Sequence, residues 1–367
     1  MAASPADDGF ERGLTPREGP ALVLGRGGSG RTELIARRVA ALVSAGVAVD
    51  QIAVLTQSAA NQAHLRERVA ELLSGSYEEV SIETWPGFAE RMLREYALEA
   101  GLDPFFETAS PADRLALLLD HLDDLPLRRH EIRGNPAGLL ARLLERIDAL
   151  KAEGIGPAEL RDRARAAERG APGRADREVA LREIEFSELF DRHDATMLQF
   201  GVLDEGELIL ELGRLLTRHS DLSDVVGDRL GKLLVDELED AGRPRVGLLP
   251  LLAPHGNVLA TCDPEQGLKV HRAHGEAAAV GFLRAFPAAI VTELPPGSRS
   301  TGDLRVAVES AMALVPGSYR QSLVLPLPEA LASGIPTDDD PLPGGEEETG
   351  GTAPPSVRFW RCANERA

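Results

Sequence analysis

A glycine-rich turn stands near the start of the chain, in the stretch ALVLGRGGSGRTEL at 21–34. Its residues follow the order G-x-x-x-x-G-R-T, which differs from the phosphate-loop pattern only in having arginine where that pattern has lysine. Glycines let backbone N–H groups point at phosphates, the following helix N-terminus adds partial positive charge, and a threonine hydroxyl can bind Mg²⁺. The predicted phosphate-binding residues are Gly25, Gly27, Gly28, Ser29, Gly30, Arg31 and Thr32. The alternative is a glycine turn that serves only helix–strand packing.

A pair of carboxylates follows a second apolar run, KLLVDELED at 232–240. Asp236 at the end of this strand can hold Mg²⁺, and Glu237 can orient and deprotonate an attacking water molecule. An acidic pair after a strand is also the ordinary composition of a solvated turn. Combined with the upstream loop, in this order along the chain, the pair favours a nucleoside triphosphate site.

Two further polar elements follow. Asp263 ends the run NVLATCD, and Gln266 comes three residues later. Arg299 follows another apolar run in LPPGSRS, where its guanidinium can reach a γ-phosphate. The alternatives are an ordinary strand exit for the first element and a surface arginine for the second.

Six short apolar runs are the elements that would position these residues. They start near residues 21, 52, 80, 232, 257 and 289 and predict one parallel sheet, with helices at about 32–44 and 61–74 between the first three. Ligands of such doubly wound α/β sheets bind outside the carboxyl ends of the strands. The sequence therefore predicts that the loop and the carboxylates meet at one sheet edge.

The strand pattern stops between about 88 and 220, where amphipathic helical patterns predict an all-helical insertion of about a hundred residues. A helix is predicted near 303–314. The acidic, Pro- and Gly-rich segment at 333–356 is typical of a disordered linker. The chain ends on VRFWRCANERA, whose few apolar residues predict the start of a domain that is cut off.

Composition limits the function classes. The net charge of −19 excludes nucleic-acid binding by general attraction and requires a local groove instead. No signal peptide pattern and no apolar run of membrane length is present in the sequence, which predicts a cytoplasmic protein without a membrane partner. Cys262 and Cys362 are predicted to be free thiols. Asp191, His193 and Asp194 lie on a predicted helix and are interpreted as a solvated face without a metal.

Seven stretches in order resemble the N-terminal half of the superfamily 1A DNA helicases of the UvrD/Rep/PcrA type, over about residues 14 to 314. The stretches are GRGGSGRT, IAVLTQSAANQAHLRERV, VSIETWPGFAERMLREYA, FGVLDEGELI, LLVDELED, CDPEQGL and LPPGSRS. The second keeps Leu55, Thr56, Arg66, Arg68 and Val69 of the family motif, and the third keeps Thr84, an aromatic residue at Trp85, Phe88 and Ala89.

The resemblance implies an α/β fold, a RecA-like P-loop NTPase sheet interrupted by an all-helical domain. The first RecA-like domain (1A) would cover 14–100 and 201–295, the helical domain (1B) 101–200, and the start of a second RecA-like domain 296–367. It also implies ATP and Mg²⁺ as cofactors and 3′ to 5′ movement on single-stranded or partly duplex DNA, in repair or recombination.

Site roles follow from motif position. Gly30, Arg31 and Thr32 would bind phosphates and Mg²⁺, Asp236 would hold the metal, Glu237 would be the catalytic base, and Gln266 and Arg299 would sense the γ-phosphate. Thr56, Thr84 and Trp85 fall in the motifs for DNA contact, with a core tryptophan as the alternative at Trp85. The family's last motifs lie in a second RecA-like domain, which a longer parent chain or another chain would have to supply.

Several residues depart from the family pattern. Arg31 replaces lysine, Glu239 replaces glutamine, Gln57 replaces phenylalanine and Pro86 replaces histidine. These departures support a rival hypothesis, a degenerate helicase-like subunit that does not hydrolyse ATP. Such a subunit would serve as scaffold or DNA-binding partner of an active helicase or nuclease subunit. An unrelated phosphate-loop kinase or GTPase is disfavoured, because the long insertion and the Asp263/Gln266 element have no role there.

Overall fold

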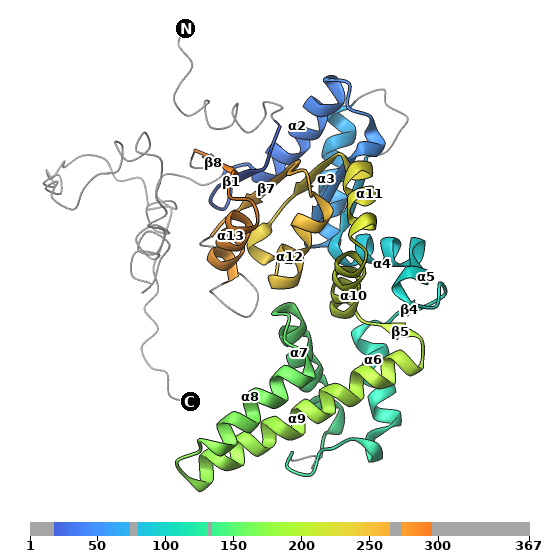
Figure 1. The fold of residues 1–367 in the computed structure, drawn as a ribbon, viewed down its shortest axis with the longest axis vertical. Helices are drawn as coiled ribbons and strands as arrows, with labels where there is room; N and C mark the ends of the chain where they lie inside the picture. Colours follow the sequence, from blue (N-terminus) through green and yellow to red (C-terminus); the bar gives the residue numbers. More distant parts are fainter. Residues whose placement is uncertain (1–17, 74–79, 131–133, 265–273, 296–367) are drawn as a thin grey trace, which may run out of the picture. The chain divides into compact units, whose positions relative to one another are not determined.

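A six-stranded sheet carries the predicted site. The computed structural model describes residues 18–73, 80–130, 134–264 and 274–295, without the side chains of 274–276. The strands are β1 (Ala21–Leu24), β2 (Ile52–Thr56), β3 (Ser81–Thr84), β6 (Lys232–Val235), β7 (Val258–Cys262) and β8 (Ile290–Glu293). They run in the order β3-β2-β6-β7-β1-β8, and all neighbours pair in parallel (Figure 1). The six strands are the six apolar runs found in the sequence, and the predicted α/β class is confirmed.

The register brings the ends of the central strands level. Leu24 of β1 pairs with Cys262 of β7, and Val235 of β6 pairs with Ala260 of β7 and Leu55 of β2. Strands β6, β7 and β1 are direct neighbours although about 200 residues separate β1 from β6. The segments that follow these three strands therefore emerge side by side at one edge.

Helices cover both faces of the sheet. Alternate residues of a strand point to opposite faces, and in the central strands both sets of side chains are apolar and must be buried. Val23, Val54 and Leu234 pack with α2 (Arg31–Ser44) and α3 (Ala59–Leu72). Leu22, Leu55 and Val235 belong to the larger core on the other face. The helices contributing to that core are α4 (Trp85–Glu95), α5 (Ala97–Ala100), α10 (Glu205–Arg218), α11 (Ser220–Leu230), α12 (Arg243–Leu252) and α13 (His274–Ala285).

The insertion is helical, as predicted, and has its own core. It contains α6 (Pro111–Asp120), α7 (Pro136–Ala152), α8 (Pro157–Arg169) and α9 (Arg174–Gln199). Apolar side chains of α6, α7, α8 and α9 form a separate cluster that includes Leu118, Leu140, Leu160 and Phe186. Helix α6 begins with a capping box between Ser110 and Asp113. Each of α6, α7 and α8 has proline in its first turn. The N–H groups of the first turn have no acceptor within the helix, so the N–H that proline lacks costs no hydrogen bond there.

A short strand pair differs from the predicted absence of strands in this region. β4 (Glu107–Thr108) and β5 (Val202–Leu203) pair in parallel where the chain enters and leaves the helical segment. A strand of two residues is too short to show a periodic pattern, so these two strands could not be predicted from the sequence. Three 3₁₀ turns, Val49–Gln51, Leu122–Asp124 and Leu238–Asp240, complete the described elements. The domain boundaries expected from the resemblance stay predictions.

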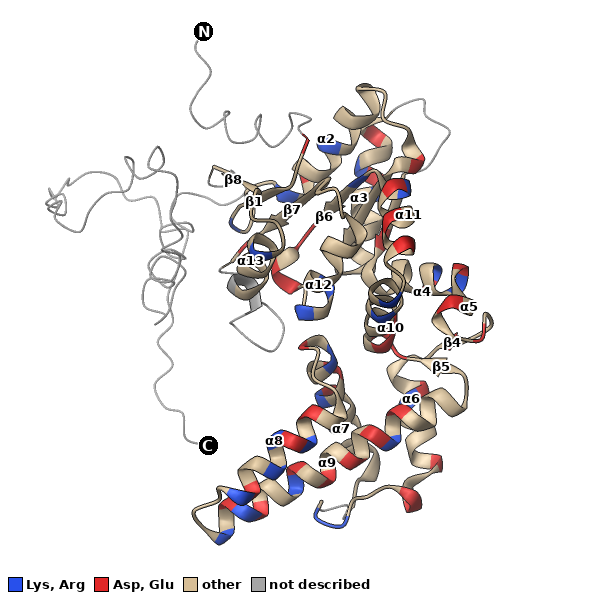
Figure 2. Cartoon of the chain, in the orientation of Figure 1, with Lys and Arg blue, Asp and Glu red and all other residues tan. Residues whose placement is uncertain are grey.

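Charges of both signs alternate along the exposed helices of the insertion. Figure 2 shows basic and acidic residues intermixed on α8 and α9. Arg161 of α8 pairs with Asp191 of α9, and Arg177 of α9 pairs with Glu168 of α8. These two helices therefore present a mixed surface and no continuous basic stripe. Within the described ranges, no helix is both long and apolar enough to cross a bilayer.

Candidate functional site

The glycine-rich turn has the backbone of an anion cradle. Gly28 and Gly30 have φ angles of 81° and 90°, a conformation that disfavours other residues. Gly30 is the N-cap of α2, and as a glycine it offers no side chain to cap the N–H groups of the first helical turn. A Cβ at Gly25 would overlap the hydroxyl of Ser29, so a larger residue there would require the Ser29 side chain to move. The hydroxyl Oγ of Ser29 is buried without a hydrogen-bond partner among the described residues.

Asp236 lies at the carboxyl end of β6, fully buried. Its Oδ1 accepts a hydrogen bond from Thr261 Oγ1 at 2.5 Å, and its Oδ2 accepts one from Asn61 Nδ2 at 3.0 Å. Asn61 Nδ2 also donates to Thr56 Oγ1 at 2.8 Å. Two donors therefore fix the orientation of the carboxylate predicted to hold Mg²⁺. Neither Asn61 nor Thr261 was predicted, because each becomes significant only when β2, β6 and β7 lie side by side.

Glu237 adopts a strained backbone next to this carboxylate. Its φ of 57° makes it the one non-glycine residue with positive φ in the described ranges. Such conformations cost about 1–3 kcal/mol and gather at functional sites. Gln57 Nε2 donates to the Glu237 carbonyl at 3.1 Å, and Arg245 Nη1 donates to Gln57 Oε1 at 2.6 Å. Burial and then the charge of Asp236 raise the pKa of the Glu237 carboxyl above its ordinary value, which makes it a better proton acceptor.

Arg31 and Glu239 form an ion pair inside the site. Arg31 Nη1 donates to Glu239 Oε1, and both side chains are nearly enclosed, with 11% and 4% exposed. Glu239 Oε2 accepts a hydrogen bond from the backbone N–H of Asp263 at 3.0 Å. Arg31 Nη2 lies 4.0 Å from the carboxylate of Asp263. The loop after β1, the 3₁₀ turn after β6 and the end of β7 are thus joined by side chains, at the edge where the sequence placed them.

The residues predicted to contact DNA have structural partners. Trp85 is fully buried in the core, which fits the alternative of a core tryptophan and leaves no ring face open for stacking. Thr56 is also fully buried. Thr84 caps α4, and its Oγ1 accepts the N–H of Gly87 at 3.2 Å. Gln266 and Arg299 lie outside the described residues, so their expected γ-phosphate roles stay predictions.

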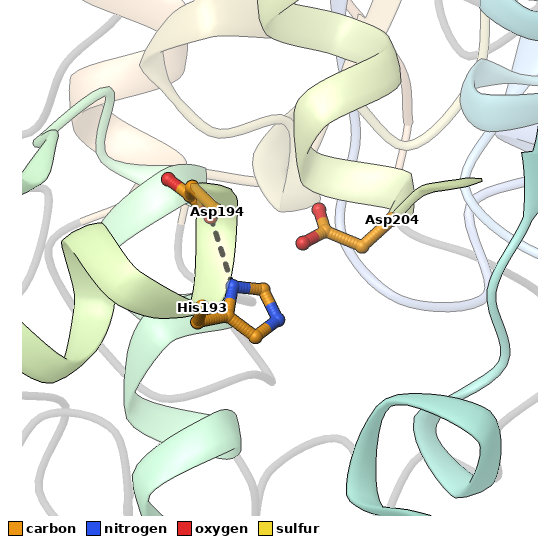
Figure 3. Close-up of side chains that lie close together, drawn as sticks. All are labelled: His193, Asp194 and Asp204. Carbon is orange, nitrogen blue, oxygen red and sulfur yellow. Dashed lines mark hydrogen bonds and ion pairs between the residues drawn. The ribbon is translucent and has the colours of Figure 1, made fainter. Parts of the chain in front are cut away.

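A second polar cluster lies where the insertion meets α10. His193 and Asp194 of α9 and Asp204, the N-cap of α10, approach one another closely enough to suggest a metal site, and His193 Nδ1 is 2.9 Å from Asp194 Oδ1 (Figure 3). Lys151 Nζ lies 2.8 Å from oxygens of both aspartates. Arg114 Nε donates to His193 Nε2 at 3.2 Å. Lys151 and Arg114 supply positive charge to this cluster, and His193 is fully buried, so the interpretation of these residues as a solvated face is wrong for His193.

The edge of the sheet fits a phosphate chain with a divalent cation. The positive-φ glycines and the start of α2 suit an anion, and the buried carboxylate of Asp236 suits Mg²⁺. Thr32 is the second residue of α2, beside the cradle. Cys262 at the end of β7 carries a buried thiol whose pKa is raised by burial, which makes it unreactive.

Comparisons with known proteins agree with this geometry. A family model described as UvrD/REP helicase N-terminal domain matches residues 9–271. The chain is 28% identical to the ATP-dependent DNA helicase Rep of Salmonella typhimurium over 83% of this chain and 43% of that protein. It is 27% identical to the ATP-dependent DNA helicase UvrD1 of Mycobacterium tuberculosis, covering 87% and 42%, and 24% identical to DNA helicase II of Escherichia coli, covering 79% and 38%. The chain thus spans about two fifths of the length of these relatives.

Proposed function

The chain belongs to the UvrD/REP helicase N-terminal domain family, and from this premise we propose that it is the ATP-binding portion of a DNA helicase or translocase. The observation that carries the proposal is the meeting of three segments at one sheet edge. These are the glycine loop with Arg31, the carboxylates Asp236 and Glu237, and Asp263 after β7. Movement from 3′ to 5′, a role in repair or recombination and a cytoplasmic location are part of this proposal.

The chain's residues would divide the work of ATP hydrolysis. When bound, ATP would supply the phosphoryl group that is transferred to water. Bound Mg²⁺ would supply positive charge that neutralises the phosphate oxygens. The loop from Gly25 to Gly30 orients the phosphates through backbone N–H groups, and Thr32 with Asp236 holds the metal. Glu237 accepts the proton of the attacking water, aided by its raised pKa. Gln266 and Arg299 are proposed to contact the γ-phosphate.

The proposed partner is single-stranded or partly duplex DNA. The net charge of −19 and the mixed charges of α8 and α9 favour a confined groove over a broad basic surface. Thr56 and Thr84 end adjacent strands, β2 and β3, so contact is proposed for the surface at that end of the sheet. Because both side chains bond within the protein, backbone groups would make this contact.

One observation favours the second candidate, a helicase-like subunit that binds DNA or an active helicase or nuclease subunit without hydrolysing ATP. Arg31, which replaces the lysine of the phosphate-loop pattern, is engaged by Glu239. A guanidinium is wider than an ammonium group and differs from it in shape, so the γ-phosphate would be held less accurately. Small errors of position reduce rates strongly. The two candidates differ in turnover, so one assay separates them.

The test is an equilibrium titration of a fluorescent ATP analogue, with Mg²⁺, into the full chain. Thr32→Ala and Asp236→Ala should each raise the Kd at least about tenfold, because each removes a metal contact. Thr217→Ala, the same change as Thr32→Ala at an exposed position on α10, and Asp191→Ala, at an exposed position on α9, should leave the Kd unchanged. Equal affinity in all five proteins would refute a nucleotide site at this edge.

Turnover then separates the candidates. Glu237→Gln removes the proposed base and serves as the reference. If the parent chain releases phosphate from ATP faster than this variant does, the chain hydrolyses ATP and the helicase or translocase proposal is supported. Nucleotide binding with release no greater than that of Glu237→Gln supports the non-hydrolysing subunit. Both measurements use saturating single-stranded DNA, so that a requirement for DNA does not conceal activity.

A further inference from the structure

Glu239 is held firmly against the phosphate loop. It lies in the 3₁₀ turn Leu238–Asp240 and is 3% exposed. One carboxylate oxygen accepts from Arg31 and the other from the backbone N–H of Asp263. Asp263 directly follows β7, so the Glu239 carboxylate cannot move away from Arg31 without also losing its bond to this backbone N–H. The ion pair is therefore a fixed part of the site.

The two residues of this pair are also two of the departures from the helicase motif pattern. Arginine stands where the pattern has lysine, and glutamate stands where it has glutamine. Arginine binds carboxylates and phosphates through the same fork of N–H donors, so the two anions compete for it. Phosphate binding at Arg31 and ion pairing with Glu239 therefore draw on the same guanidinium.

We propose that Glu239 is a built-in competitor for the phosphates of the nucleotide, so that nucleotide binding requires Arg31 to exchange the Glu239 carboxylate for a phosphate oxygen. The inference rests on the proposed nucleotide site and names the residue that sets its affinity. Glu239 lowers affinity in two ways: it occupies the guanidinium, and it places a negative charge next to the phosphates. A glutamine at this position keeps the bond to the Asp263 N–H and removes both effects.

The experiment measures the Kd of a fluorescent ATP analogue with Mg²⁺ for the full chain and for Glu239→Gln. The expected result is a Kd at least about tenfold lower in the variant, the size expected from one charge-assisted hydrogen bond. Asp240→Asn is the matched control, since it removes one carboxylate from the same 3₁₀ turn without touching the pair with Arg31. It should change the Kd less than about threefold.

A double-mutant cycle isolates the competition. In an Arg31→Ala background, Glu239→Gln should gain clearly less affinity than in the parent chain, because only the repulsion between the carboxylate and the phosphates is left to remove and no guanidinium remains to be released. Glu239→Ala provides a second test of release that does not depend on how glutamine packs, and circular dichroism checks that each variant is folded. Competition between adenosine and the fluorescent analogue tests whether the gain depends on the phosphates. Because adenosine has no phosphates, its Ki should be equal in the parent chain and in Glu239→Gln.

The outcomes are distinguishable. An unchanged or higher Kd in both Glu239 variants, an equal gain in Asp240→Asn, or a full gain in the Arg31→Ala background would overturn the role of Glu239 while leaving the nucleotide site intact. Binding by Glu239→Gln but not by the parent chain supports the inference. Absence of binding in every protein overturns the proposed nucleotide site and the inference with it.

Discussion

Replacement of Lys151 by methionine tests whether the helical insertion is fastened to α10 by buried charge. Lys151 is 2% exposed, and its Nζ lies 2.8 Å from Asp194, 2.8 Å from Asp204 and 2.9 Å from Glu207. Methionine keeps the volume of the stem, so the loss of packing is small. Asp204 is buried too, and among the described residues it would retain Arg114 as its one paired cation, at 3.6 Å. Removing one partner of a buried ion pair costs about 3–5 kcal/mol, which is the loss of unfolding free energy expected for Lys151→Met.

Urea unfolding at pH 7, followed by circular dichroism, measures this loss. Arg163→Met is the control, because Arg163 forms an exposed i,i+4 pair with Glu159 and should lose less than about 0.5 kcal/mol. Combining Lys151→Met with Asp204→Asn should recover part of the stability, since the buried negative charge is then absent. A loss below about 1 kcal/mol for Lys151→Met, or no recovery in the double variant, would refute the view that buried charge drives the effect.

Two further predictions concern stability. Burial by itself raises the pKa of Asp204, but the charges of Lys151 and Arg114 outweigh it and hold the pKa below its ordinary value of 3.8. The ionised Asp204 therefore contributes to the free energy of unfolding above pH 3.8, and this contribution is lost as the pH falls through the lower pKa of the folded state. In urea unfolding, the difference in stability between the parent chain and Asp204→Asn should therefore narrow below about pH 4. Gly242→Ala should lower the thermal midpoint, at a cost of about 1–3 kcal/mol, because a Cβ there would overlap the backbone carbonyl of Ala152. Gly247→Ala on the exposed side of α12, where a Cβ has open space, should raise stability by about 0.5–1 kcal/mol, and an opposite order of the two midpoints would contradict this reasoning.

Local pattern was enough to predict the elements of the site. Strands β1, β2, β6 and β7 are short apolar runs that alternate between two cores, so their type and place could be found from neighbouring residues alone. The predicted helices at 32–44 and 61–74 correspond to α2 and α3 for the same reason. The carboxyl ends of parallel strands lie at the same edge of a sheet. The predicted fold class was therefore enough to place the loop after β1 close to Asp236.

Side-chain pairing across that edge was decided only by the tertiary structure. Arg31 and Glu239 are 208 residues apart, and they meet because β7 lies between β6 and β1, an order that no local pattern encodes. The burial of Trp85 and the enclosure of Lys151 by three carboxylates likewise depend on how helices from distant segments pack. The sequence by itself determined which groups reach the site, through short-range periodicity and the chemistry of each residue type. Which of these groups neutralise one another depends on contacts between distant segments, and these exist only once the sheet and its helices have assembled.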